Sequence, residues 1–171
     1  MTVNQLEVNE YNGYFQTYIN KVGSHCLSEG LKKNGEAVVA FFNSIPEAKF
    51  NYKYSDDKWT VKEVLLHIID TERIFAYRAL RILRQDKTPL AGYEQDDYVK
   101  CYNCLNRTMS SLIKEYQSVR SATQTLFDSC DEVMLKNMGV ASNNPISARA
   151  IGFIIIGHEN HHIDVLKERY L

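Results

Sequence analysis

The feature that most constrains the fold of this chain is an apolar, histidine-rich segment at its end, residues 150–171. Apolar side chains recur there every three to four residues, the spacing of a helix with one buried face. His158 and His162 are four residues apart, so on a helix they lie one turn apart on that face. A buried imidazole needs a partner, because an unsatisfied polar group in a core is costly. The fold must therefore bring partners to this face.

Two interpretations of this histidine pair are open at this point. A histidine on an apolar face is most often a core residue satisfied by a hydrogen bond. Two in successive turns can instead share a metal ion, since neutral imidazole is the commonest metal ligand. A metal ion needs a third protein ligand, which has to come from elsewhere in the chain.

Composition places the chain among ordinary globular proteins. Its 171 residues are enough for one domain, residues 1–171, with a sizeable core. Hydrophobic residues are 44% and charged residues 24%. The net charge of −1 lacks the basic excess that a nucleic-acid partner requires. No apolar run reaches the ~18 residues of a membrane span, and the N-terminus lacks the pattern of a signal peptide. We therefore expect a cytoplasmic protein with no membrane partner.

The four cysteines give no clear signal of chemistry. In a cytosolic chain they are expected to be free thiols. Cys101 and Cys104 form a C-x-x-C, but it has neither the second pair of a zinc ribbon nor the βαβ setting of a redox site. We interpret this pair as incidental.

Four segments of helical periodicity predict an all-α protein, an antiparallel four-helix bundle. Thr60 and Glu63 form a capping box that begins the second helix, and Pro145 and Ser147 open the last. Aromatic residues near the N-terminus indicate a short extra helix that packs on the body. We expect a short helix in 9–20 and long helices over 24–45 and 61–84, followed by a loop over 85–97. The third long helix is expected from about Val99 or Asn103 to Phe127, with Leu105 in its apolar stripe. An irregular stretch over 129–144, with one helical turn at 131–137, then leads to the final helix.

His67 is the candidate third ligand. It is the only other histidine inside a strongly amphipathic helix, and metal sites in bundles are built in the core from facing helices. If the second and last helices face each other, three imidazoles can meet and leave one coordination position open, as in catalytic sites. A ligating imidazole usually donates its other N–H to a carboxylate or carbonyl group. The nearby carboxylates in sequence are Asp70, Glu159 and Asp164.

These residues also resemble a known family. Residues 59–72, WTVKEVLLHIIDTE, are similar to the second-helix motif of the DinB-like (YfiT-like) superfamily, and residues 157–162, GHENHH, to its H-x-x-x-H motif. Residues 75–80 and 92–98 also look like one branch of it. The resemblance implies a four-helix bundle with a divalent metal held by His67, His158 and His162. His161 is the neighbour that could exchange roles with His162.

The resemblance also implies the class of reaction. Relatives include thiol S-transferases that use bacillithiol or mycothiol, a thiol-dependent isomerase and proteins described as metal-dependent hydrolases. We therefore expect a metal-dependent enzyme acting on a small molecule, thiol S-transferase-like or hydrolase-like. Zinc, nickel or iron would serve, with a low-molecular-weight thiol as a further cofactor. Arg78 is the leading candidate for a substrate contact, ahead of Arg81 and Arg149.

A competing hypothesis is a non-catalytic metal-binding or stress-related bundle that acts as a homodimer or through a protein partner. Catalysis needs an open metal position and a pocket, whereas a binding module does not. A fourth protein ligand, such as Asp70 or a cysteine, would favour the non-catalytic class. The aromatic residues near the N-terminus are compatible with a homodimer in either case.

Overall fold

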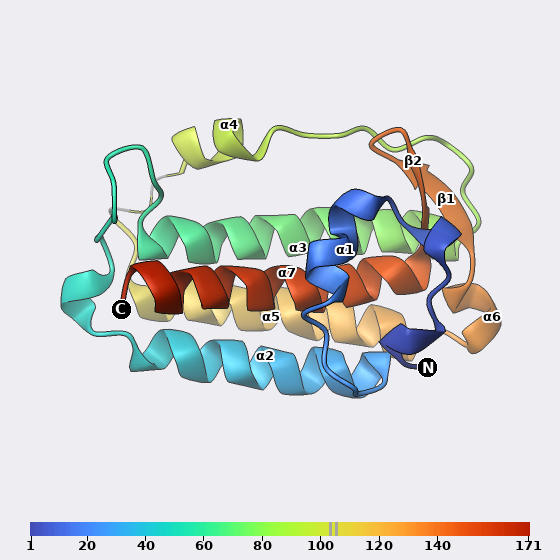
Figure 1. The fold of residues 1–171 in the computed structure, drawn as a ribbon, viewed down its shortest axis with the longest axis horizontal. Coiled ribbons are helices and arrows are strands. Elements are labelled where there is room, and N and C mark those ends of the chain that lie inside the picture. The colour runs from blue at the N-terminus through green and yellow to red at the C-terminus, as the bar shows by residue number, and fades with distance from the viewer. Residues whose placement is uncertain (103, 105) are drawn as a thin grey trace.

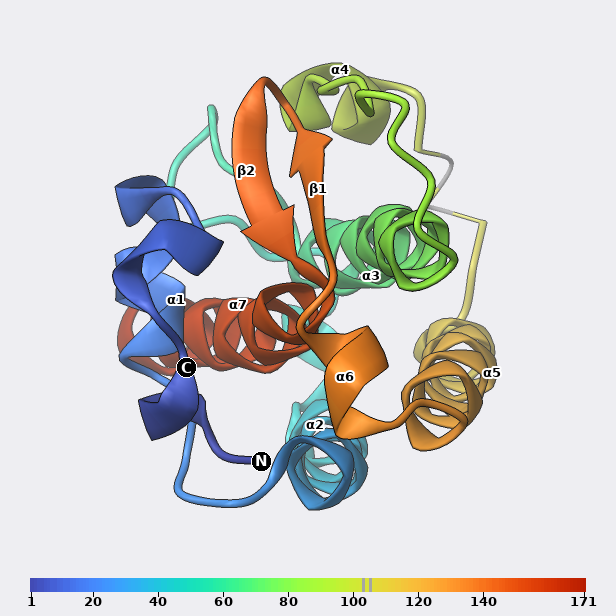
Figure 2. The ribbon, with the colours of Figure 1, turned by 90° about the vertical axis from the view of Figure 1, so that its right-hand side faces the viewer.

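The computed structural model describes residues 1–102, 104 and 106–171, and its body is a bundle of four long helices (Figure 1). The end-on view in Figure 2 shows the four helices side by side around a common core. They are α2 (Leu27–Ser44), α3 (Val61–Leu83), α5 (Met109–Asp128) and α7 (Ala148–Arg169). The predicted four-helix bundle is confirmed. Within the described residues, no helix has the length and apolar character needed to cross a membrane.

Of the four pairs of neighbouring long helices, two are antiparallel and two are parallel, so the antiparallel arrangement expected from the sequence holds for half of the pairs. After α3, residues 84–108 return along the outside of the bundle, so α5 begins at the same end as α3 (Figure 1). We call residues 84–108 the crossover segment; it carries the short helix α4 (Gln95–Lys100). Consequently α3 and α7 run antiparallel to each other, and they form the most extensive contact in the bundle. This is the contact that the histidines of the sequence analysis require.

Side-chain caps set where the helices begin. Thr60 Oγ1 accepts from the Glu63 N–H at 3.2 Å and Glu63 Oε2 accepts from the Thr60 N–H at 2.7 Å, which confirms the capping box. Ser147 Oγ accepts from the Ala150 N–H at 3.0 Å and caps α7, as expected.

The predicted start of the third long helix, near Val99 or Asn103, is wrong. Thr108 Oγ1 accepts from the Ser111 N–H at 3.1 Å and so caps α5. Val99 instead belongs to α4, whose beginning falls in the expected loop over 85–97. Asn103 and Leu105 lie outside the described residues.

A small hairpin replaces part of the expected irregular stretch. The expected helical turn is present as α6 (Glu132–Leu135), but β1 (Met138–Ala141) then pairs with β2 (Asn144–Ser147). Ser142 and Asn143 form a two-residue turn with φ of 50° and 62°, the left-handed conformation that tight hairpins need. Pro145, expected to open the last helix, lies in β2 opposite Val140.

The N-terminal segment packs against α7. It consists of 3₁₀ turns at Val3–Gln5, Val8–Glu10 and Gly13–Phe15 followed by the short helix α1 (Gln16–Ile19), so the predicted N-terminal helix is present but short. Gly157 permits this contact, because a Cβ there would lie 1.9 Å from the carbonyl oxygen of Tyr18. The absence of a side chain at position 157 therefore brings Tyr18 beside the histidines of α7.

The core is apolar at both ends of the bundle and polar in the middle. One apolar cluster includes Leu31, Phe75, Ile82 and Ile151. The other includes Phe42, Leu65, Leu112 and Leu166. Between them, each long helix contributes polar residues at its centre: Asn34 from α2, His67, Thr71 and Glu72 from α3, Tyr116 and Arg120 from α5, and His158, Glu159 and His162 from α7. The candidate site lies in this layer.

Candidate metal centre

Three imidazoles from two antiparallel helices converge in the polar layer. His67 projects from α3, and His158 and His162 project from successive turns of α7. His158 Nε2 lies 3.1 Å from His67 Nε2 and 3.0 Å from His162 Nε2. The structure thus brings together the three residues that the sequence analysis selected.

Burial keeps these imidazoles neutral. His67 is 2% exposed and His158 is 5% exposed. Burial lowers the pKa of His67 to about 4. It also lowers the pKa of His158 and of His162 well below the usual range, and the neighbouring histidines add to both effects. Neutral imidazole is the form that binds metal ions.

The three Nε2 atoms cannot satisfy one another's hydrogen-bonding capacity. A neutral imidazole nitrogen offers either one N–H or one lone pair, yet His158 Nε2 faces two other Nε2 atoms. One cation would accept all three lone pairs. The donor atoms lie within 4.8 Å of one another, and two nitrogens bound tetrahedrally to zinc would be about 3.3 Å apart. No fourth histidine, cysteine or carboxylate joins this group in the described part of the chain. The donor set therefore fits a divalent ion with an open position.

Aromatic side chains surround the imidazoles. The Trp59 ring lies 4.8 Å from the His67 ring and stacks at 6.5 Å on the His162 ring. The Tyr18 ring meets His158 edge-on at 5.3 Å. Position 161 is directed elsewhere: the His161 ring contacts Tyr18 at 5.4 Å and is not part of the cluster. The geometry thus selects His162 over His161 as the third member.

The residues around the cluster differ from those expected. None of the three nearby carboxylates has a contact with the cluster histidines among the described residues. Asp70 pairs with Arg73, Asp164 pairs with Lys21, and Glu159 pairs with Arg120. The Thr71 hydroxyl is near His67 Nδ1 at 3.5 Å and is hydrogen-bonded to the Tyr93 hydroxyl at 3.0 Å. Thr71 lies four residues after His67, so helical spacing predicts that it is a neighbour on the next turn. Sequence reasoning missed Tyr18, because no spacing rule connects it to the site.

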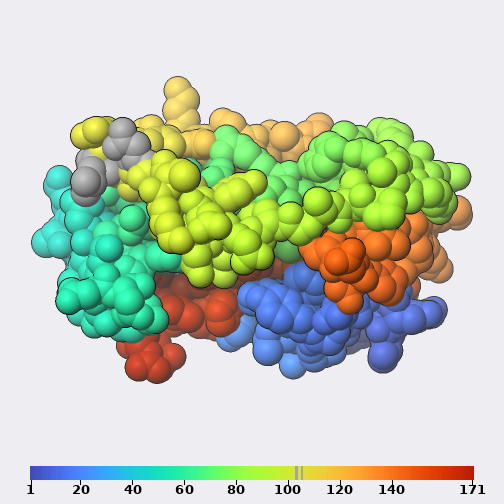
Figure 3. Space-filling view, turned by 90° about the horizontal axis from the view of Figure 1, so that it is seen from above, coloured from blue at the N-terminus to red at the C-terminus, as the bar shows by residue number. Residues whose placement is uncertain are grey.

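Two cavities reach the cluster, and residues of the crossover segment line both. A cavity of about 800 Å³ is lined by His161 and His162 together with Trp59 and Tyr170. A smaller cavity, of about 290 Å³, is lined by His158. Asp96 lines both. In Figure 3 the crossover segment and the N-terminal segment form the two rims of this face, with α7 visible between them. Tyr93, Glu94, Gln95 and Asp96 of the crossover segment line the smaller cavity.

The three arginines considered as substrate contacts have different surroundings. Arg78 is buried and lines the smaller cavity with His158. Arg81 pairs with Asp86, and Arg149 pairs with the buried Glu10. Of the three, only Arg78 combines a place beside the histidines with the lack of a carboxylate partner in the described residues.

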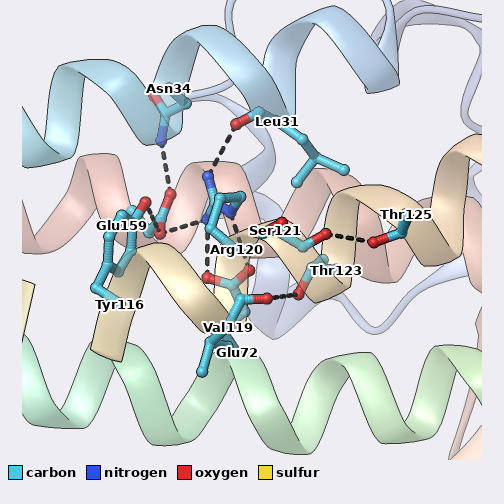
Figure 4. A network of polar contacts seen from close by, with 10 residues as sticks. All are labelled: Leu31, Asn34, Glu72, Tyr116, Val119, Arg120, Ser121, Thr123, Thr125 and Glu159. Atoms are coloured by element: carbon cyan, nitrogen blue, oxygen red, sulfur yellow. Dashed lines mark hydrogen bonds and ion pairs between the residues drawn. The ribbon is translucent and has the colours of Figure 1, made fainter. Parts of the chain in front are cut away.

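An ionic network centred on the buried Arg120 includes Glu159, the residue that follows His158 (Figure 4). Arg120 Nε and Nη2 donate to the two carboxylate oxygens of Glu72, each at 2.9 Å, and Nη2 also contacts Glu159 Oε1 at 2.5 Å. Tyr116 and Asn34 donate to Glu159 at 2.8 and 2.7 Å. Burial raises the pKa of Glu159 despite the nearby guanidinium. The network connects all four long helices next to His158.

Comparison with known proteins agrees with this arrangement. The family model of the DinB superfamily matches residues 31–166. The chain belongs to the DinB superfamily. Its structure is similar to that of YfiT from Bacillus subtilis, described as a probable metal-dependent hydrolase with an unusual four-helix bundle topology. The TM-score is 0.72 at 16% identity, over 82% of this chain and 84% of YfiT.

A second solved structure shares the fold of this DinB-superfamily chain. It is a mycothiol-dependent maleylpyruvate isomerase, with a TM-score of 0.63 at 7% identity. The match covers 99% of this chain and 63% of the isomerase. At these identities the two likenesses establish the fold. No curated protein shows significant sequence similarity to this chain.

Proposed function

We propose that this DinB-superfamily chain is a metal-dependent enzyme that acts on a small molecule, with His67, His158 and His162 as the ligands of one divalent ion. The observation that carries the proposal is the convergence of three neutral imidazoles, with His158 Nε2 at 3.0–3.1 Å from Nε2 of the other two and no fourth histidine, cysteine or carboxylate joining them in the described residues. Zinc, nickel and iron all suit such a donor set. When bound, the ion supplies Lewis acidity, which activates water or a thiol near neutral pH.

The residues of the chain position the reaction. The rings of Trp59 and Tyr18 pack on the imidazoles and hold their orientation. The crossover segment covers the cluster and limits the access of water, which strengthens electrostatic interactions inside the site. Burial raises the pKa of Tyr93, so its hydroxyl stays protonated and able to donate a hydrogen bond.

The reaction is either thiol transfer or hydrolysis. Both fit a metal position that opens onto cavities of about 290 and 800 Å³, large enough for a small substrate with a thiol co-substrate. The similar structure of a probable metal-dependent hydrolase supports hydrolysis, and that of a mycothiol-dependent isomerase supports the use of a thiol. The single domain over residues 1–171, the cytoplasmic location and the homodimer stay predictions.

The first experiment is metal analysis of untagged protein by mass spectrometry. We expect about one divalent ion per wild-type chain and none in His67→Ala. His25→Ala is the matched control, because His25 is exposed and lies outside the cluster. Absence of bound metal, with no uptake of added zinc or nickel, would contradict the proposal.

Activity assays then separate the enzyme from the alternative, a non-catalytic metal-binding or stress-related bundle. The metal-loaded protein is tested with ester and amide panels, and with electrophile panels in the presence and absence of small thiols. Turnover that depends on His67 supports the enzyme, and a requirement for thiol selects the transferase class. Stoichiometric metal without turnover in any panel favours the alternative.

A further inference from the structure

Arg78 is a buried cation without a carboxylate partner. It projects from α3, is 5% exposed, and has no ion pair among the described residues. Its Nη2 donates to the Ala91 carbonyl oxygen at 2.7 Å and to Ser142 Oγ at 3.1 Å, and both acceptors are neutral. Burying a charge is costly unless it is paired, so this arrangement needs a reason.

The other buried arginines show how this protein normally satisfies such a charge. Three arginines are buried in the part of the chain that the structure describes. Arg120 contacts Glu72 and Glu159, and Arg149 contacts Glu10. Arg78 alone of these three lacks an anion. A guanidinium stays protonated in proteins, so its charge must be balanced from outside the set of described side chains.

The Arg78 guanidinium lines the smaller cavity and keeps donors available for a ligand. Both hydrogen bonds use Nη2, which leaves Nε and Nη1 without an acceptor in the described residues. Among the side-chain polar atoms of the described residues, only the Tyr102 hydroxyl is both fully buried and without a hydrogen-bond partner. The two free nitrogens of Arg78 are therefore in contact with solvent. The cavity of about 290 Å³ that Arg78 lines also reaches His158 and Thr71.

Aromatic side chains form much of the remaining lining of this cavity, beside the carboxylates of Glu94 and Asp96. Tyr14, Phe15, Tyr18, Phe75 and Tyr93 line it. The Arg78 guanidinium lies 5.7 Å from the Phe75 ring centroid and 5.9 Å from that of Tyr93. The Arg78 cation, the His158 imidazole and the aromatic rings together suit a small molecule with an anionic group and an apolar body.

We propose that Arg78 binds a carboxylate of the substrate or co-substrate, whose apolar body lies among the cavity's aromatic rings and whose reacting end meets the histidine cluster. The role of the histidine cluster in this inference rests on the proposed function. The anion site is argued from the surroundings of Arg78 alone. One guanidinium matches one negative charge. The exposed Glu94 and Asp96, which also line the cavity, disfavour a dianion such as a phosphate monoester.

A purely structural role for Arg78 makes a different prediction. Its two hydrogen bonds connect the crossover segment at Ala91 to the hairpin turn at Ser142. If tying these segments together were its only role, replacing Arg78 would lower stability without changing how the protein discriminates charged from neutral ligands. The experiment therefore measures how much more tightly the protein binds a charged ligand than a neutral one.

The test uses phenylacetate and its neutral isostere phenylacetamide as probes, measured by ligand-observed NMR and calorimetry. The full chain is first stripped with a chelator, so that a carboxylate cannot bind a metal ion. We expect the wild type to bind phenylacetate about tenfold or more tightly than phenylacetamide, the size of one charge-assisted hydrogen bond. Arg78→Gln should lose this preference and Arg78→Lys should keep part of it. Arg81→Gln removes a charge from the same helix outside the cavity and should keep it fully.

Several outcomes would overturn the inference. They are equal binding of the two probes to the wild type, a preference that survives in Arg78→Gln, or tighter binding of phenyl phosphate than of phenylacetate. If Arg78→Gln does not fold, the wild-type comparison and Arg78→Lys still decide. A carboxylate preference in a protein that takes up no metal would refute the proposed function and support the anion site at Arg78. Metal uptake without the preference would refute the anion site and support the proposed metal centre.

Discussion

At the scale of single residues, the choice between two adjacent histidines shows how helix geometry selects a site. His158 and His162 are separated by four residues, close to the 3.6 residues of one turn, so their rings meet on one face. The His161 ring instead packs on Tyr18 and on the His162 ring, and its nitrogens are not part of the ligand group. We predict that His162→Ala abolishes stoichiometric metal binding, whereas His161→Ala retains it.

Titration with zinc or nickel, followed by calorimetry, checks this prediction. The loss of a direct ligand should weaken binding by more than the roughly 10–100-fold that loss of a supporting group costs. The two variants are matched controls for each other, because each removes one imidazole from neighbouring positions of α7. Equal losses in both, or a larger loss in His161→Ala, would show that the cluster is not the metal site.

At the scale of elements, the Arg120 network decides how the four long helices hold together. Arg120 is 4% exposed and pairs with two buried carboxylates. Removing one partner leaves uncompensated charge in the core, so we predict that Arg120→Met lowers the free energy of unfolding by about 3–5 kcal/mol. The exposed Arg73, which pairs with Asp70 and Glu115, is the control, with about 0–1 kcal/mol expected for Arg73→Met. Urea denaturation of both variants provides the comparison, and similar small losses would mean that the network adds little.

A second prediction at this scale concerns the docking of the N-terminal segment on α7. Burial raises the pKa of Glu10, but its hydrogen bonds with Arg149 and Ser147 outweigh this effect and lower the pKa overall. The contribution of Glu10 to stability is therefore complete above the pKa of a free glutamate, about 4.3, and is lost as pH falls through the lowered folded-state value. Glu10→Gln should destabilise the protein at neutral pH, and its difference from wild type should shrink in acid. A difference that is constant with pH would contradict this.

At the scale of the whole molecule, the proposed metal would join α3 to α7 through one coordination sphere. A ligand that binds only the folded state at a thousand times its Kd adds about 4 kcal/mol to stability. For a chain of this size we predict that added zinc or nickel raises Tm by roughly 8–16 °C. The chelated protein is the reference, and His67→Ala should show no shift. An equal shift in that variant would place the binding elsewhere.

Local sequence patterns predict the four long helices and the two helix faces that carry the histidine cluster. The periodicity that predicts α3 and α7 places His67, His158 and His162 on buried faces, and these signals are local, within one or two turns. The capping box at Thr60 is local in the same way. The position of Thr108 as the cap of α5 competed with other polar residues in the crossover segment, so that boundary was missed.

The surroundings of the cluster depend on contacts between segments that are far apart in the chain. The contact between Tyr18 and His158 joins residues 140 positions apart and depends on the absence of a side chain at Gly157. The network of Arg120 with Glu72 and Glu159, and the unpaired state of Arg78, likewise depend on which helices are neighbours. The crossover segment sets that order, because its path makes α3 and α5 parallel. Such contacts follow from packing among distant segments, and a sequence pattern reports only the face on which each residue lies.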